Sequence, residues 1–191
     1  ESKNSTKKLR GHDIAMIFQE PMTALNPSLK CGKQVSEIIQ LHLNYSSSKA
    51  KKETISLFEK VKLPRPHEIY NSYPHQISGG QMQRVMIAMA IACKPKLLIA
   101  DEPTTALDVT VQKEIMLLLK DLQKETKMSM LFISHDLGLV SEIVDRVAVM
   151  YKGNIVEEGS SFQVFKLPKE NYTKALMASR PSLDTRLQEL P

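Results

Sequence analysis

Residues Ser78 to Asp108 read SGGQMQRVMIAMAIACKPKLLIADEPTTALD, and this stretch decides the fold. Ser78 can serve as a helix N-cap, and Gln81 three residues later can return the hydrogen bond, which is the pattern of a capping box. Gly79 and Gly80 leave the first helical turn without side chains. Because free N–H groups and the positive end of the helix dipole attract anions, this helix start predicts a phosphate site, with an ordinary capped helix as the alternative.

The residues that follow indicate a buried helix and a buried strand. Val85 to Cys93 is apolar on every face, so this helix is expected inside a core. After the break at Lys94-Pro95-Lys96, Leu97 to Ala100 is a short apolar run typical of a buried parallel strand. Asp101 and Glu102 end that strand, at the edge where such sheets bind ligands. The pair can divide two tasks, one carboxylate holding Mg²⁺ and the other polarising water, whereas a solvated strand end is the alternative.

Five segments together resemble the motifs of ABC-type ATPases. ISGGQMQR (77–84), LLIADEP (97–103), TALD (105–108) and LFISHD (131–136) resemble the signature, Walker B, D-loop and switch-histidine motifs, and IFQEPMTALNP (17–27) resembles the Q-loop. Their order and approximate spacing are those of the family, which makes the resemblance specific. The sequence of these segments is most similar to that of the ATPase subunits of dipeptide, oligopeptide and nickel importers, and the resemblance covers most of the chain.

This resemblance implies ATP and Mg²⁺ as cofactors and gives each candidate residue a role. Glu102 would polarise the attacking water, Asp101 would hold Mg²⁺, and Gln19 would contact both the metal and the water. His135 would touch the γ-phosphate. Five residues would bind nucleotide: Ser78, Gly79, Gly80, Gln81 and Asp108. Those that belong to the signature would act across a dimer interface.

The resemblance also implies the fold: an α/β, P-loop NTPase-like parallel sheet with flanking helices and an α-helical subdomain, incomplete at the N-terminus. Residues from about 30 to 93 would form the α-helical subdomain with the signature motif. Residues 94–159 would form the core from Walker B to the switch histidine, and residues 160–191 an importer-type extension.

Hydrophobic patterns predict the remaining elements. Asp13 to Phe18 and Met128 to Ile133 read as strands, and Arg146 to Tyr151 with Asn154 to Glu158 reads as a hairpin. The two prolines in Glu20 to Pro27 favour a loop. Apolar residues at helical spacing predict further helices around 35–39, 55–61 and 115–122, the last capped by Asp108.

A Gly-rich phosphate loop of the form GxxxxGK[ST] is not found, because no two glycines are five positions apart. The amides and lysine of that loop hold the nucleotide phosphates, so we expect the 191-residue chain alone to bind ATP poorly and to hydrolyse none. A sheet without the corresponding strand is also expected to expose an unpaired edge beside apolar surface, and to aggregate.

Composition limits the classes of function. With 42% apolar and 25% charged residues the chain is globular, and its excess of 26 basic over 21 acidic side chains is modest, so no nucleic-acid partner is expected. Cys31 and Cys93 have no metal or redox spacing, which fits a reducing compartment. Val85 to Cys93, the longest apolar run, is far short of a membrane span, so any membrane role comes through a partner.

Two functions stay open. In the first, these residues are the C-terminal portion of an importer ATPase that drives uptake of peptides or a related solute. Its partners would be a second ABC subunit in a head-to-tail dimer, transmembrane permease subunits and, indirectly, a solute-binding protein, at the cytoplasmic face of the plasma membrane. In the second, the chain is a degenerate subunit that only supplies its signature motif to an intact partner. A soluble ABC protein of repair or translation is weakened by the importer-like loop at 20–27.

Overall fold

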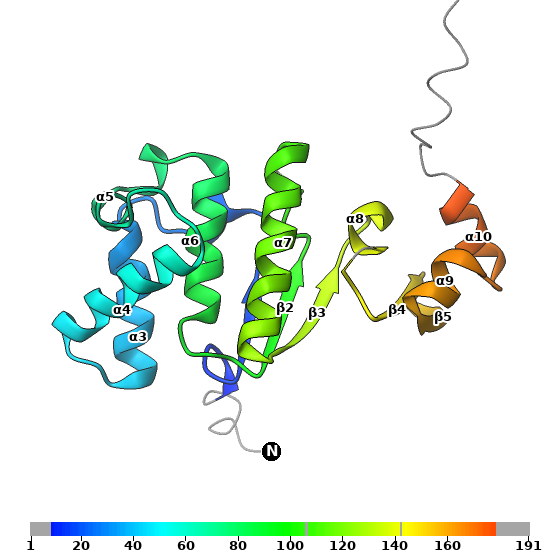
Figure 1. Cartoon of the computed structure of the whole chain (residues 1–191), viewed down its shortest axis with the longest axis horizontal. Coiled ribbons are helices and arrows are strands. Elements are labelled where there is room, and N and C mark those ends of the chain that lie inside the picture. The colour runs from blue at the N-terminus through cyan, green and yellow to red at the C-terminus, as the bar shows by residue number, and fades with distance from the viewer. Residues whose placement is uncertain (1–8, 106, 142, 179–191) are drawn as a thin grey trace, which may run out of the picture. The chain divides into compact units, whose positions relative to one another are not determined.

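The computed structural model of the chain describes residues 9–105, 107–141 and 143–178. The chain divides after Ile133 into two compact units (Figure 1). The first unit carries a sheet and most of the helices, and the second carries a hairpin with short helices. The three-part division inferred from the sequence stays a prediction.

A three-stranded parallel sheet forms the centre of the first unit. Its strands are β1 (Ile14–Ile17), β2 (Leu97–Asp101) and β3 (Ser129–Ile133), in the order β1-β2-β3. Parallel neighbours need long crossover connections, and the helices between the strands provide them. The strands predicted at 13–18, 97–100 and 128–133 are thus confirmed to within one residue at each end.

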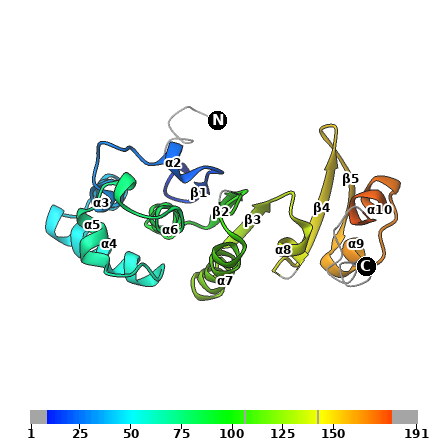
Figure 2. The ribbon, with the colours of Figure 1, turned by 90° about the horizontal axis from the view of Figure 1, so that it is seen from above.

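Two helices cover one face of this sheet. Figure 2 shows α6 (Gly79–Ile91) and α7 (Val109–Thr126) on the same side of the strands. Because side chains alternate along a strand, every second residue of each strand packs towards these helices. Leu98, the second residue of β2, is fully buried in this layer. The strand residues of the covered face are Ala15, Ile17, Leu98, Ala100, Met130 and Phe132.

The opposite face of the sheet is apolar and open among the described residues. Met16 is 37% exposed and Leu131 is 51% exposed, and the register places both beside Ile99. The expectation that β2 is buried on both faces is therefore wrong for the described part of the chain, because Leu97 and Ile99 are only half-buried where no described helix packs on them. The predicted apolar surface beside the sheet is present, and it continues into a hollow of about 560 Å³ lined mostly by apolar side chains.

A cluster of helices packs against α6 and completes the core of the first unit. Phe58 and Val35 are fully buried there, as the helical periodicity around these positions predicted. The predicted loop at Glu20 to Pro27 contains one helical turn, since Pro21 stands at the first helical position, where a missing N–H group costs nothing. The elements of the cluster are α2 (Pro21–Ala24), α3 (Cys31–Leu43), α4 (Ser47–Lys60), α5 (Pro66–Asn71) and the 3₁₀ turn η1 (Pro74–Gln76).

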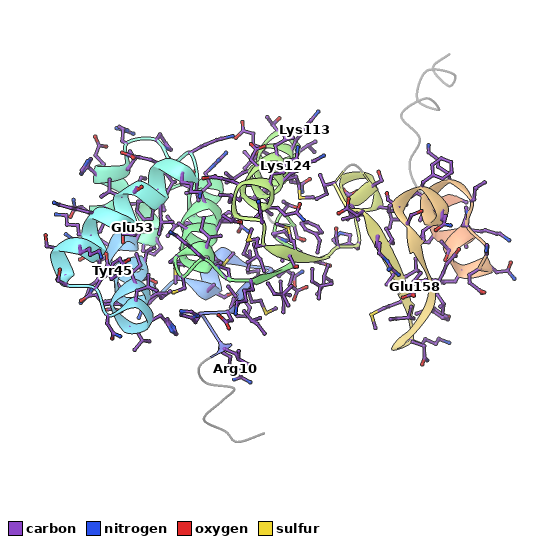
Figure 3. The ribbon with its side chains drawn as sticks, turned by 60° about the horizontal axis from the view of Figure 1, so that its bottom comes forward. Arg10, Tyr45, Glu53, Lys113, Lys124 and Glu158 are labelled. Carbon is purple, nitrogen blue, oxygen red and sulfur yellow. The ribbon has the colours of Figure 1, made fainter. Side chains whose placement is uncertain are left out.

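Arg84 ties the middle of α6 to its neighbours. Its side chain is 11% exposed, and its two Nη groups donate to the Val61 carbonyl at 3.0 Å and to the Glu114 carboxylate at 2.7 Å. Both partners lie on other helices, α7 and the end of α4, so a single buried cation holds three helices together. On the exposed side of α7, Lys113 and Lys124 project into solvent (Figure 3).

Both cysteines are buried, and neither forms a disulfide. Burial raises the pKa of the Cys31 thiol to about 11, and it raises the pKa of Cys93 as well. The prediction that Cys93 packs as a small apolar group is confirmed. Since the thiolate is the reactive form of cysteine, this burial disfavours reactivity at both side chains.

The second unit is built on an antiparallel hairpin of β4 (Arg146–Tyr151) and β5 (Asn154–Ser160). Its turn, Lys152 and Gly153, has φ of 48° and 81°, the positive values that a two-residue hairpin loop requires. The predicted hairpin is confirmed, with its second strand two residues longer than expected. Three short helices complete the unit: α8 (Leu137–Ser141), α9 (Ser161–Lys166) and α10 (Asn171–Ala178). None of the helices in the described ranges has the length and apolar character needed to cross a bilayer.

The one-sided core predicts a large difference between two leucines of the sheet. Leu98→Ala should lower the free energy of unfolding by about 2–5 kcal/mol, because it leaves a cavity under the helices. Leu131→Ala, on the open face, should lower it by about 0.5 kcal/mol or less. Urea unfolding of the two variants of the complete subunit measures both values, and equal losses would show that the open face of the sheet is covered in solution.

Candidate functional site

Gln19 and Glu102 meet at the edge of the sheet where β1 and β2 end. Gln19 follows β1 by two residues, and Glu102 follows β2 directly. The Nε2 group of Gln19 donates a hydrogen bond to Oε2 of Glu102 at 2.7 Å. Residues 83 positions apart are joined in this way because parallel strands finish at the same edge, where sheets of this kind bind ligands.

The main chain of Glu102 is held in an unusual conformation. Its φ is +43°, in the left-handed region that residues with a Cβ seldom adopt, and it precedes Pro103, which further restricts it. The Glu102 N–H group still bonds to the Ile133 carbonyl at 2.9 Å, so pairing with β3 continues to this residue. Such a conformation costs about 1–3 kcal/mol and is typically kept at functional sites.

Thr105 is a contact of this site that the sequence did not reveal. Its Oγ1 hydroxyl donates to Glu102 Oε2 at 2.9 Å, and its N–H group reaches the Glu102 carbonyl at 3.3 Å. One carboxylate oxygen therefore accepts hydrogen bonds from both Gln19 and Thr105, which fixes its position. The spacing Glu-Pro-x-Thr is the available signal, because a turn with proline in second place returns its fourth residue to its first.

Asp101 is the last residue of β2 and is half-buried beside this pair. Among the described residues no group of three or more His, Cys, Asp or Glu side chains could hold a metal ion by itself. Mg²⁺ needs no such group, since it is typically bound by one or two carboxylates together with waters and phosphate oxygens. The Asp101 carboxylate and the amide oxygen of Gln19 are oxygen ligands of this kind, so the residues present fit Mg²⁺ held jointly with a phosphate.

The start of α6 has the capping box that the sequence predicted. The Ser78 hydroxyl accepts from the Gln81 N–H group at 3.3 Å, and the Gln81 side chain accepts from the Ser78 N–H group at 3.0 Å. A helix start has four N–H groups without a partner inside the helix, and the box satisfies two of them. The other two, on Gly79 and Gly80, have no acceptor among the described residues. They are donors suited to an anion.

The two glycines of this helix start meet different surroundings. A Cβ atom on Gly79 would come no closer than 3.7 Å to Leu107, whereas one on Gly80 would lie 2.9 Å from Cγ1 of Val111. Gly80 therefore allows α6 to approach α7, and only Gly79 leaves room at the surface. The lack of a side chain at Gly80 thus has a packing reason of its own, and the approach of a phosphate to the N–H groups of both glycines stays a prediction.

Asp108 caps α7 next to this contact. Its Oδ1 accepts from the Val111 N–H group at 3.0 Å, as predicted. The side chain of Gln112 also donates to the Thr104 carbonyl at 3.0 Å. The segment from Glu102 to Asp108 is thereby fixed at both ends, and it connects the acidic edge of the sheet with the helix that packs on the signature residues.

His135 belongs to the second unit. It is exposed and lies between β3 and α8. Beside it, the Ser134 hydroxyl accepts from the N–H group of Asp136 at 2.9 Å, a local turn that leads into α8.

Known proteins are similar to this chain in sequence. The family model described as ABC transporter matches residues 1–105. Oligopeptide transport ATP-binding protein OppD of Bacillus subtilis (strain 168) is 52% identical over 188 residues, 98% of this chain and 52% of that protein. Glutathione import ATP-binding protein GsiA of Escherichia coli (strain K12) is 54% identical over 177 residues, 93% of this chain and 28% of that protein. The chain thus spans at most about half the length of these relatives.

Solved structures give the same result. The ATP-binding cassette MJ0796, solved as a dimer in a post-hydrolysis state with ADP and Pi, has a TM-score of 0.74 and 28% identity, covering 84% of this chain and 68% of that one. The structure of cbiO1 from Clostridium perfringens, part of the ABC transporter complex cbiONQ, also has a TM-score of 0.74 and 28% identity. The match covers 87% of this chain and 64% of that one.

These neighbours confirm the predicted fold class, an ATPase cassette with a parallel sheet and flanking helices. The family model covers more than half of the 191 residues, and the relatives carry the resemblance through nearly the whole chain. This chain therefore belongs to the ABC transporter family.

Proposed function

We propose that this chain is part of an ATP-hydrolysing subunit that energises an importer of peptides or a related solute. The observation that carries the proposal is the contact of Gln19 with Glu102, which joins the Q-loop to the end of the Walker B strand. Two of its relatives are named for oligopeptide transport and for glutathione import, which supports peptides as the class of solute.

At the sheet edge the roles follow from chemistry. Glu102 accepts a proton from the attacking water, and Asp101 supplies a carboxylate ligand to Mg²⁺. Bound Mg²⁺ neutralises charge on the phosphates of ATP. Gln19 can serve both neighbours at once, because an amide has a donor end and an acceptor end: Nε2 holds Glu102, and Oε1 remains the end suited to a metal.

The signature helix start acts on a second subunit. Its Gly79 and Gly80 N–H groups donate to phosphate oxygens of a nucleotide held by the partner in a head-to-tail dimer, an interaction that stabilises charge across an interface. Two features support this role. These donors have no acceptor among the described residues, and the structurally similar cassette MJ0796 was solved as a dimer. Ser78, Gln81 and Asp108 hold the surrounding helix starts in place.

The wider assembly follows from the same proposal. His135 contacts the γ-phosphate, and the segment Glu20 to Pro27 meets transmembrane permease subunits. The subunit lies peripherally at the cytoplasmic face of the plasma membrane, and a solute-binding protein delivers the solute to the permease. Pro21, Pro27 and the single helical turn between them support a shaped loop at this contact.

The role of Glu102 predicts a loss of turnover without a loss of binding. In the complete transporter, Glu102→Gln should slow ATP hydrolysis by about 10²–10⁴-fold, the usual contribution of a general base, while ATP binding is kept. Steady-state hydrolysis and equilibrium nucleotide binding measure the two quantities. As a control, Glu125→Gln removes an exposed carboxylate of α7 that pairs with Lys60, and it should leave both unchanged. Normal hydrolysis by Glu102→Gln would refute the assignment.

The proposed role of the signature residues across the dimer interface predicts which nucleotide site loses hydrolysis when the signature of one subunit is blocked. In a dimer with Ser78→Arg on one subunit only, hydrolysis should be lost at the partner's nucleotide and kept at the mutated subunit's own, because bulk at the helix start obstructs the facing phosphate. Ser47→Arg, which places the same charge at the start of α4, is the control and should affect neither site. Site-resolved hydrolysis measures the outcome, and loss at the mutated subunit's own site contradicts the proposal.

A further inference from the structure

Gln34, in the first turn of α3, is a buried polar residue whose side chain serves the loop before that helix. It is 7% exposed. Its Nε2 group donates to the carbonyls of Asn26 at 3.1 Å and Leu29 at 3.0 Å, and its Oε1 accepts from the Asn26 N–H group at 2.9 Å. A single amide thus makes three hydrogen bonds to one short stretch of main chain.

We propose that Gln34 is a positioning residue that fixes the loop 25–30 in the conformation that meets the permease, and so couples ATP hydrolysis to uptake. The coupling rests on the proposed function, whereas the fixing of the loop rests on the hydrogen bonds alone.

The Gln34 hydrogen bonds add to a turn that the loop forms by itself. Asn26 forms a small turn in which its Oδ1 accepts from the Ser28 N–H group at 2.9 Å and its carbonyl accepts from the Leu29 N–H group at 3.2 Å. The Asn26 carbonyl is therefore shared between Leu29 and Gln34. Such an arrangement needs both ends of an amide in one orientation, and a buried donor or acceptor left without a partner is costly.

The same loop is connected to the catalytic edge by a short, ordered path. Gln19 bonds to Glu102, and the next residue, Glu20, accepts at its carbonyl from Thr23 and Ala24 in the turn of α2. Leu25 follows with 2% exposure, anchored in the core. Only residues 20–25 separate Gln19 from Asn26, so movement of Gln19 is transmitted along one helical turn to the stretch that Gln34 holds.

Other buried polar residues of α3 do not share this arrangement. Ser36, two residues along the helix and 4% exposed, bonds to the Thr54 hydroxyl at 2.9 Å and to the Tyr70 hydroxyl at 3.2 Å. These partners lie on the helices α4 and α5 and not on the loop. Ser36 is therefore a matched control, similarly buried and on the same helix, whose side-chain partners lie outside residues 25–30.

The first experiment measures the loop directly and does not depend on activity. Amide hydrogen exchange is followed in the complete transporter with Gln34→Met, which keeps the length of the side chain but removes its hydrogen bonds, and with Ser36→Ala. The Asn26 amide should exchange about tenfold faster in Gln34→Met, the protection that one hydrogen bond gives, and should not change in Ser36→Ala. Unchanged exchange in Gln34→Met would overturn the fixing of the loop.

A second variant keeps the test decisive if Gln34→Met does not fold. Gln34→Glu retains an acceptor for the Asn26 N–H group but loses the donor to the Asn26 and Leu29 carbonyls. Compared with the unmodified protein, Gln34→Glu should speed exchange of the Leu29 amide, because the carbonyls of Asn26 and Leu29 lose their donor, and it should speed exchange of the Asn26 amide less. Exchange of both amides unchanged from the unmodified protein would overturn the fixing of the loop.

The second experiment measures coupling in the complete transporter. Solute uptake per ATP hydrolysed should fall about fivefold or more in Gln34→Met while hydrolysis itself persists, and it should be unchanged in Ser36→Ala. An unchanged ratio in Gln34→Met would overturn the coupling role alone. Absence of ATP-driven uptake with the unmodified protein would overturn the proposed function and the coupling role together, whereas the exchange result would still decide whether Gln34 fixes the loop.

Discussion

Parallel pairing of β2 with β1 and β3 is the constraint on which the candidate site depends. It brings the ends of strands that are far apart in sequence to one edge, where Gln19 hydrogen-bonds Glu102. A shift of the register by one residue would exchange the two faces of a strand, and it would place apolar side chains of β2 away from α6 and α7. The burial of Leu98 and the position of Glu102 are therefore consequences of the same pairing.

The helices α6 and α7 connect the signature residues to this sheet by packing. Gly80 lets α6 pack closely on Val111, and Arg84 joins the same helix to Glu114. The starts of α6 and α7 consequently form one body with the loop that leads from Glu102 to Asp108. Within a single subunit, the residues assigned to its own nucleotide and those assigned to the partner's nucleotide are thus mechanically connected.

The sequence predicted what depends on local spacing. The caps by Ser78 and Asp108 were predicted because a capping side chain and the N–H group that donates to it lie within one helical turn. The strands were predicted because each is a short apolar run with polar residues after it. Thr105 and Gln34 were missed because their contacts depend on the path of the main chain. Ile99 shows a related limit: an apolar residue in a strand can be buried, but its own sequence does not say what covers it.

A double-mutant cycle between Gln19 and Glu102 tests the central claim most directly. Gln19→Ala, Glu102→Ala and the double variant are compared by urea unfolding of the complete ATPase subunit, and the coupling energy is the part of the stability change that is not additive. A direct hydrogen bond to a carboxylate predicts a coupling of about 0.5–1.5 kcal/mol. A coupling of zero would contradict the account, because it would mean that the ends of β1 and β2 do not bring these two side chains together in solution.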